Sequence, residues 1–234
     1  MSIPPSDAFD SITAGELSAR YDKFVTDLLG GIAYGELSAF ERLSSDARYS
    51  PTLNDRAVLG RMAVTEFGHF EAVCARLLEM GMDPELAMLP FQRMVDAFHE
   101  RTRPADWHES LMKAYVVDAI TEDFYAAIAE HLDADTRGVI AAVRTSEEQT
   151  ALLADRLKTM LAEDPRLSSR LALWGRRLVG EALTQAQRIG AKHSFLVGLT
   201  PDGTQKDAET EVAAILTSLT RGHSRRMSKL GLTA

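Results

Sequence analysis

The sequence has very little of what would indicate a disulfide-bonded, membrane-spanning or low-complexity protein. Cys74 is its only cysteine, which excludes an internal disulfide framework and a cysteine-only zinc cluster. Only 15 glycines and 8 prolines occur in 234 residues, too few for a collagen-like or linker-like chain. No run of about 18 consecutive apolar residues occurs, so neither a transmembrane helix nor a membrane partner is expected. The opening residues lack the basic and apolar regions of a signal peptide, and the expected location is the reducing cytoplasm.

Alanine, leucine and charged residues are what the chain has in abundance. The sequence is 45% apolar and 26% charged, and runs of β-branched residues are rare, which favours an all-α protein. The charge is unevenly distributed. Residues 1–165 contain 29 acidic and 15 basic side chains, whereas residues 166–234 contain 5 acidic and 11 basic ones. This basic C-terminal third either complements the acidic body within one fold or contacts a phosphate-bearing partner.

Apolar residues at helical spacing predict a series of long helices. The predicted helices cover about 14–45, 53–80, 106–131, 133–162, 167–190 and 207–230. The links after the first and the third helix are short, so each of these pairs is predicted to be antiparallel. Residues 83–104 contain three prolines and form a connection long enough to cross a bundle about 30 Å long. The pattern therefore predicts a four-helix bundle with one long crossover, followed by two C-terminal helices.

Carboxylates in the apolar seam of such a bundle are the first candidates for a functional site. A buried carboxylate is unfavourable unless it is paired or bound to a cation. Glu36 shares one face of the first helix with Ile32 and Phe40. On the second helix, Glu66 and His69 lie three residues apart and face the same way. A carboxylate and an imidazole one turn apart can chelate one metal ion, and this donor set suits iron or manganese.

The third and fourth predicted helices also carry acids on their apolar sides. Asp118 and Glu122 form an acid pair at i, i+4, and two like charges at that spacing destabilise a helix modestly. A metal ion or an arginine should therefore compensate them. On the fourth helix, Glu147 falls in the apolar stripe with Ile140, whereas Glu148 falls on a side that reads as solvated. Periodicity thus predicts that Glu147 points inward.

In chain order these acids resemble the ligands of the ferritin-like di-iron carboxylate proteins, which use one Glu from each of two helices and a Glu-x-x-His from each of the other two. The matching residues are Glu36, Glu66, His69, Glu122 and Glu147. We call Glu36, Glu66 and His69 the first metal position, and Glu122 and Glu147 the second. The resemblance covers residues 14–162. It implies one ferritin-like domain over residues 1–234, whose core bundle spans 14–162 and whose C-terminal helical extension spans 163–234.

The same resemblance implies a cofactor and a class of reaction. The cofactor would be iron, one or two ions, with manganese as the alternative metal. The protein would be an oxygen-activating oxidoreductase or hydroxylase. Glu66 and Glu147 would bridge two irons, and Glu36 and Glu122 would be terminal ligands.

The second metal position departs from the family pattern. Thr150 and Ala151 stand where the second Glu-x-x-His would have its histidine. This position is then filled by carboxylates and water, by Glu181 of the next helix, or not at all, so we expect an asymmetric site that is fully occupied only at the first position. The alternative is a degenerate, non-catalytic bundle with a structural or interaction role. Its acids would be satisfied by arginines such as Arg61 or Arg144.

The C-terminal third carries a second, weaker resemblance. The segments Trp174-Gly175-Arg176-Arg177 and Gly180-Glu181-Ala182 resemble the tail of the bacterial tRNA 2-methylthio-N6-isopentenyladenosine hydroxylase-like group. This implies a tRNA partner contacted through basic side chains. The candidates are Arg176, Arg177, Arg221, Arg225, Arg226 and Lys229. The charge balance favours the other outcome, in which the last arginines pair with acids of the bundle. A second copy of the chain, in a homodimer, is a further candidate partner.

Overall fold

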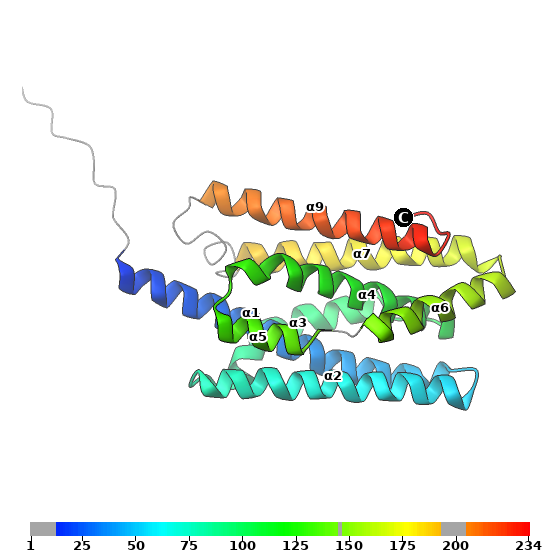
Figure 1. Ribbon diagram of the computed structural model, residues 1–234, viewed down its shortest axis with the longest axis horizontal. Coiled ribbons are helices and arrows are strands. Elements are labelled where there is room, and N and C mark those ends of the chain that lie inside the picture. Colours follow the sequence, from blue (N-terminus) through cyan, green and yellow to red (C-terminus); the bar gives the residue numbers. More distant parts are fainter. Residues whose placement is uncertain (1–12, 145–146, 193–204) are drawn as a thin grey trace, which may run out of the picture.

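The computed structural model describes residues 13–144, 147–192 and 205–234, and nearly all of them are helical (Figure 1). The α-helices are α1 (Ala14–Asp46), α2 (Leu53–Glu79), α3 (Pro84–Arg101), α4 (Trp107–Ile128), α5 (Ala134–Ala142), α6 (Glu147–Glu163), α7 (Leu167–Lys192) and α9 (Gln205–Lys229). Short 3-10 turns at Ala47–Tyr49 and Ala129–His131 follow α1 and α4. No strand occurs in these residues, so the predicted all-α class is confirmed.

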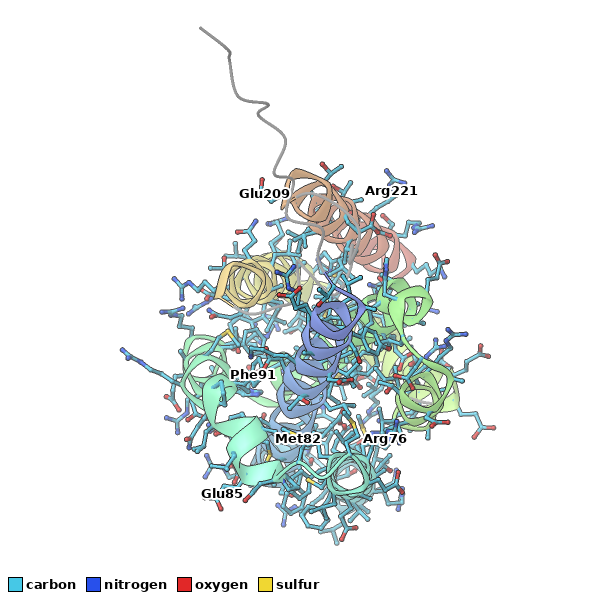
Figure 2. The ribbon with its side chains drawn as sticks, turned by 90° about the vertical axis from the view of Figure 1, so that its left-hand side faces the viewer. Arg76, Met82, Glu85, Phe91, Glu209 and Arg221 are labelled. Carbon is cyan, nitrogen blue, oxygen red and sulfur yellow. The ribbon has the colours of Figure 1, made fainter. Side chains whose placement is uncertain are left out.

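The helices run back and forth along one common axis (Figure 1). Seen along that axis, α1 lies in the middle, α2 and α3 lie on one side, and α9 lies at the opposite edge (Figure 2). Helix α1 packs against α2 and α3, and α4 packs against α6, α7 and α9. The C-terminal extension therefore packs against the bundle mainly through α4, and α7 also contacts α3. None of the described helices is both long and apolar enough to cross a membrane.

The crossover between α2 and α4 is itself a helix, where the sequence predicted an extended connection over residues 83–104. Asp83 caps α3, because its Oδ1 accepts hydrogen bonds from the backbone N–H groups of Glu85 and Leu86. Pro84 occupies the first turn, where a missing N–H does no harm, and α3 continues through Pro90. Pro84 therefore lies where α3 begins, and Pro90 removes one hydrogen bond within the helix, but the segment remains helical.

A close approach of two backbones holds α3 against α1. A Cβ atom at Gly30 would lie 2.7 Å from the carbonyl carbon of Ala87, closer than real side chains come. At Gly31 an added Cβ would lie 3.4 Å from the Phe91 ring. Only glycine at residue 30 allows this helix crossing, and it brings the apolar face of α3 beside the middle of α1.

The helix predicted over residues 133–162 is interrupted. Asp133 caps α5 by accepting a hydrogen bond from the N–H of Thr136, and the Tyr21 hydroxyl donates to the same carboxylate at 2.9 Å. Helix α5 ends at Ala142, and α6 begins at Glu147. The apolar stripe read along one continuous helix is therefore not continuous in the structure, and side chains after the break face other directions than the periodicity predicted.

The core is built from large aliphatic and aromatic side chains of every long helix. Among the fully buried ones are Phe24, Leu28, Leu59, Leu77, Leu111, Met112, Leu153, Leu157 and Leu171. Trp174 is buried as well, and its Nε1 donates a hydrogen bond to the backbone carbonyl of Glu109 at 3.0 Å. This bond joins the start of α7 to the start of α4, and Trp174 is a core residue.

Candidate metal centre

Helices α1 and α2 bring the three predicted ligands of the first metal position together. They are antiparallel neighbours, and α2 presents Glu66 and His69 on successive turns of the face that meets Glu36. One donor atom from each of the three residues lies within 4.8 Å of the other two. Nδ1 of His69 lies 3.5 Å from Oε2 of Glu36 and 3.7 Å from Oε2 of Glu66. Both carboxylates are buried and His69 is half-buried.

This donor set fits a divalent metal ion. Ligand atoms bound at about 2.0–2.2 Å from one ion lie about 3–4 Å apart, which is the spacing found around His69 Nδ1. Nδ1 is buried and has no hydrogen-bond partner among the described residues. Two carboxylates and one imidazole suit iron or manganese better than a soft metal.

Without a cation, the three groups must share protons. Burial, the largest effect, together with Glu66 beside it raises the pKa of Glu36 to about 8. Burial would also raise the pKa of Glu66, but His69 and Glu36 outweigh it and hold that pKa below its usual value. Burial would lower the pKa of His69, but the two neighbouring carboxyl groups raise it to about 9. The metal-free site therefore holds a proton on Glu36 and on His69, in the space where a metal ion would supply positive charge.

Tyr125 supports the first metal position from α4. Its buried hydroxyl donates a hydrogen bond to Oε1 of Glu36 at 3.1 Å. Burial and the nearby charge of Glu36 raise the pKa of this tyrosine well above its usual value, so it stays a neutral donor. The bond occupies one oxygen of Glu36 and leaves Oε2 directed at His69.

Asp118 is the site residue that the sequence prediction left out. It lines the same cavity as Glu36 and Glu66, and its Oδ2 is buried without a partner among the described residues. Burial, then the charges of Glu66, Glu36 and Glu122, raise its pKa well above the usual value. The signal was present in the sequence, because Asp118 shares the apolar stripe of α4 with Glu122. The family pattern has one acidic ligand from this helix, and the sequence prediction assigned that role to Glu122.

Of the predicted second metal position, the structure shows Glu122 paired with an arginine and Glu147 exposed. Glu122 lines the cavity, but its Oε2 accepts a hydrogen bond from Nε of Arg144 at 2.6 Å. This is the arginine pairing that the degenerate-bundle alternative predicted, realised at one acid. Glu147 is exposed at the start of α6, so the prediction that it points inward is wrong. The reason is the interruption between α5 and α6. Its role as a ligand remains a prediction.

The neighbours of the predicted second position are also accounted for. Thr150 is half-buried and Ala151 is exposed. Glu181, the alternative ligand from α7, forms an ion pair with Arg101 of α3, with Oε2 and Nη1 3.5 Å apart. That pairing leaves Asp118 as the additional acid that the structure places beside the first metal position.

The basic residues of the C-terminal third divide into paired and exposed ones. Nη2 of Arg226 lies 2.6 Å from Oδ2 of Asp123 on α4, which confirms the predicted pairing with the acidic body for this residue. Arg176 donates to the backbone carbonyl of Thr233 at 3.2 Å. Arg225 is exposed. Contact of this region with tRNA remains a prediction.

An apolar cavity of about 330 Å³ adjoins the carboxylates. Its lining comes mainly from α1, α3, α4, α7 and α9, and includes Phe91, which stands on α3 facing α1 (Figure 2). Along α1 the lining reaches from Leu28 to Ala39, about 16 Å at 1.5 Å per residue. Glu36, Glu66, Asp118 and Glu122 all contribute to its wall. A small apolar molecule in this cavity would lie directly beside the candidate ligands.

Known proteins share the fold of this chain. A family model described as a ferritin-like domain of actinomycetes matches residues 19–203. A solved structure, described as Protein 19 with aldehyde deformylating oxidase activity from Synechococcus, superposes with a TM-score of 0.70 at 20% identity. The match covers 93% of this chain and 94% of that one. At this identity the likeness is one of fold. None of the curated proteins matches the chain.

Proposed function

The chain belongs to the ferritin-like domain family of actinomycetes, and from that premise we propose that it is an iron-dependent, oxygen-activating oxidoreductase acting on an apolar small molecule. One observation carries the proposal. A buried Glu36–Glu66–His69 donor set, fit for a metal ion, lies in and beside the wall of an apolar cavity. A structural role alone gives no reason to bury such a group beside an empty apolar volume.

The residues of the first metal position have distinct tasks. Glu36 and Glu66 would hold the metal through carboxylate oxygens, and His69 through Nδ1. Tyr125 fixes the orientation of Glu36 by donating to its Oε1. Such a hydrogen bond to a ligand restrains its geometry and tunes its strength as a donor. Iron held there would supply the activation of dioxygen and the oxidation of the substrate.

Asp118 is the best-placed group to extend the site toward a second ion. Its Oδ2 is buried, unpaired within the described residues and surrounded by other carboxylates. Glu122 is tied to Arg144, so it is already neutralised by a protein cation. We therefore propose that Asp118 completes the donor set on the α4 side. The proposed donor set still has one histidine, His69, so the metal site remains asymmetric, as the missing second histidine predicts.

The apolar wall sets the class of substrate. Hydrophobic side chains dominate the lining, including Leu28, Ile32, Phe91, Val117, Ile128 and Leu216. Such a wall excludes water from the reacting atoms and favours an apolar ligand over a nucleotide. The description of the Synechococcus protein as an aldehyde deformylating oxidase supports oxidation of a small molecule of this kind.

Metal analysis tests the proposal. The protein is loaded with Fe(II) under anaerobic conditions, freed of excess metal, and its iron content per chain is measured. Wild type should retain iron, and Glu66→Gln and His69→Ala should lose most of it. The matched control is Glu71→Gln, an exposed glutamate on the same helix, which should retain the wild-type content.

Oxygen uptake completes the test. Addition of medium-chain aldehydes or alkanes with a reductant should raise the rate of oxygen consumption of iron-loaded wild type but not of Glu66→Gln. A wild type that retains no iron would favour the non-catalytic bundle. Retained iron without any stimulated uptake would contradict the apolar substrate.

tRNA modification is the second candidate. The exposed arginines of the C-terminal third, such as Arg221 and Arg225, support it. Because the candidate centre lies beside an apolar cavity and neither arginine is among the described lining residues, we rank tRNA modification below the small-molecule oxidase.

A further inference from the structure

Gln185 on α7 is a buried amide that has no hydrogen-bond partner among the described residues. Only 6% of the residue is exposed. Both of its side-chain atoms, Oε1 and Nε2, are inaccessible to solvent and unpaired among the described residues. Buried polar groups are nearly always paired in folded proteins, because an unpaired one loses its bonds to water without compensation. Two such atoms in one side chain indicate that a partner from outside the chain completes them.

Gln185 is one of the residues that line the apolar cavity. Helices α4 and α7 run in the same direction (Figure 1), and Gly175 lies against Met112. Gln185 and Glu122 each lie ten residues further along, so Gln185 is about level with Glu122 along the bundle. The carboxylates come from α1, α2 and α4, whereas Gln185 comes from α7. One cavity therefore holds a metal-binding group and, from a different helix, a neutral hydrogen-bonding group.

The chemistry of the lining restricts what can bind at this amide. An amide offers one acceptor and two donor hydrogens, so its best partner both donates and accepts. No lysine or arginine lines the cavity within the described residues. His99, which does line it, is held neutral, since burial and the charge of Lys113 lower its pKa to about 3. An anionic end group would meet four carboxyl groups and no lysine or arginine among the described lining residues, so the ligand is expected to be uncharged.

We propose that Gln185 is a specificity-determining residue that binds the hydroxyl group of an uncharged, chain-like alcohol whose apolar chain fills the cavity. The length of the lining along α1, about 16 Å, suits a chain rather than a compact ring system. This inference rests on the proposed function for its biological meaning, because it names the substrate class of the same site. The binding itself needs no metal, so it can be tested separately.

The experiment compares three probes of equal size on the full chain, metal-free. Decanol donates and accepts a hydrogen bond, its isomer methyl nonyl ether only accepts, and undecane does neither. Each probe displaces the uncharged dye Nile red from wild type, Gln185→Leu and Gln187→Leu. Gln187 is exposed on the same helix and serves as the matched control. The preference for decanol over the ether should be about tenfold greater in wild type than in Gln185→Leu, the loss expected for one to two hydrogen bonds.

Each outcome of this experiment either supports or contradicts the role proposed for Gln185. An equal preference in wild type and Gln185→Leu would overturn the proposal, and so would the absence of displacement by any of the three probes. Gln185→Leu should unfold at the same temperature as wild type or higher, because it removes an unpaired buried amide. A large fall in that temperature would show a structural role instead and would also overturn the proposal. The iron content of wild type is measured independently, so failure at Gln185 and failure of the metal site are distinguishable.

Discussion

Gly30→Ala tests whether the contact between α1 and α3 is as close as the structure shows. The change adds one methyl group at the helix crossing. Its carbon would lie 2.7 Å from the carbonyl carbon of Ala87, and the carbonyl oxygen is closer still. The obstructing atoms belong to the backbone of α3, so no side-chain rotation relieves the clash. Helix α3 must move away from α1 by about 1 Å, since normal carbon contacts lie near 3.5–4.0 Å.

Two opposing effects set the size of the loss. Alanine favours a helix over glycine by about 1 kcal/mol. Overpacking at a tight contact is unfavourable by about 1–3 kcal/mol, and a rigid backbone neighbour places this case at the upper end. The net loss is then about 2 kcal/mol in the free energy of unfolding. For a chain of this size that corresponds to a midpoint lower by about 4–8 °C.

Thermal unfolding followed by circular dichroism measures this shift. The control is Gly60→Ala on α2, where an added Cβ meets nothing within 4 Å. Helix propensity acts there alone, so the midpoint should rise by about 2–4 °C. A Gly30→Ala protein as stable as wild type, or more stable, would refute the close crossing. It would also refute the position assigned to α3 along the cavity.

Three further predictions concern the site and the surface. Asp118→Asn should weaken iron binding by at least about tenfold, measured by competition with a chelator. Asp135→Asn, at an exposed position, should not weaken it. An Asp118→Asn protein that binds iron as tightly as wild type would remove Asp118 from the site. Burial lowers the pKa of Lys113 to about 8, against about 10.4 in the unfolded chain, so the unfolded state binds more protons between these values. The free energy of unfolding in urea should therefore rise with pH from 8 to 10 in wild type relative to Lys113→Met, and parallel profiles would contradict this. Binding of tRNA should be weak because Arg226 is already ion-paired. Tight binding would overturn this expectation if the logarithm of the binding constant fell with the logarithm of the salt concentration, with a slope of about −0.7 per phosphate, and if Arg225→Ala/Arg226→Ala abolished it.

The first metal position could be predicted because its geometry is local. Glu66 and His69 are three residues apart on one uninterrupted helix, so periodicity alone places both on the face that meets α1. Glu36 lies in the middle of α1, far from either end. The pairing of α1 with α2 follows from the short link between them. No long-range information was needed for these three side chains.

The inward orientation predicted for Glu147 was wrong because it depended on a helix that does not continue. No glycine or proline marks the interruption after Val143, so the sequence reads as one helix through Glu147. Just after α5, Arg144 forms an ion pair with Glu122 of α4, a contact between residues 22 positions apart. The choice between Asp118 and Glu122 likewise depended on where Arg144 lies, which local periodicity does not contain.

Two further differences between the predicted and the observed structure also arise from packing between distant segments. The prolines of residues 83–104 read as helix breakers, yet Pro84 begins α3 and Pro90 lies within it. Gly68 lies on α2 between two candidate ligands, but no described atom lies within 4 Å of a Cβ placed there, whereas Gly30 and Gly31 each make a close contact with α3. A glycine shows where a close approach is permitted, and only the packing shows where it occurs.

The antiparallel pairing of α1 with α2 also bears on the order in which the protein is assembled. All three ligands of the first position lie between residues 36 and 69, so closing the loop that joins them carries little entropic penalty. Proteins rich in contacts between nearby segments of the chain fold faster than those dominated by distant contacts. Asp118 and Gln185 arrive from helices far along the chain. A nascent polypeptide ending shortly after α2 already contains the three donors of the first metal position, whereas the cavity proposed to select a substrate exists only once α7 has docked.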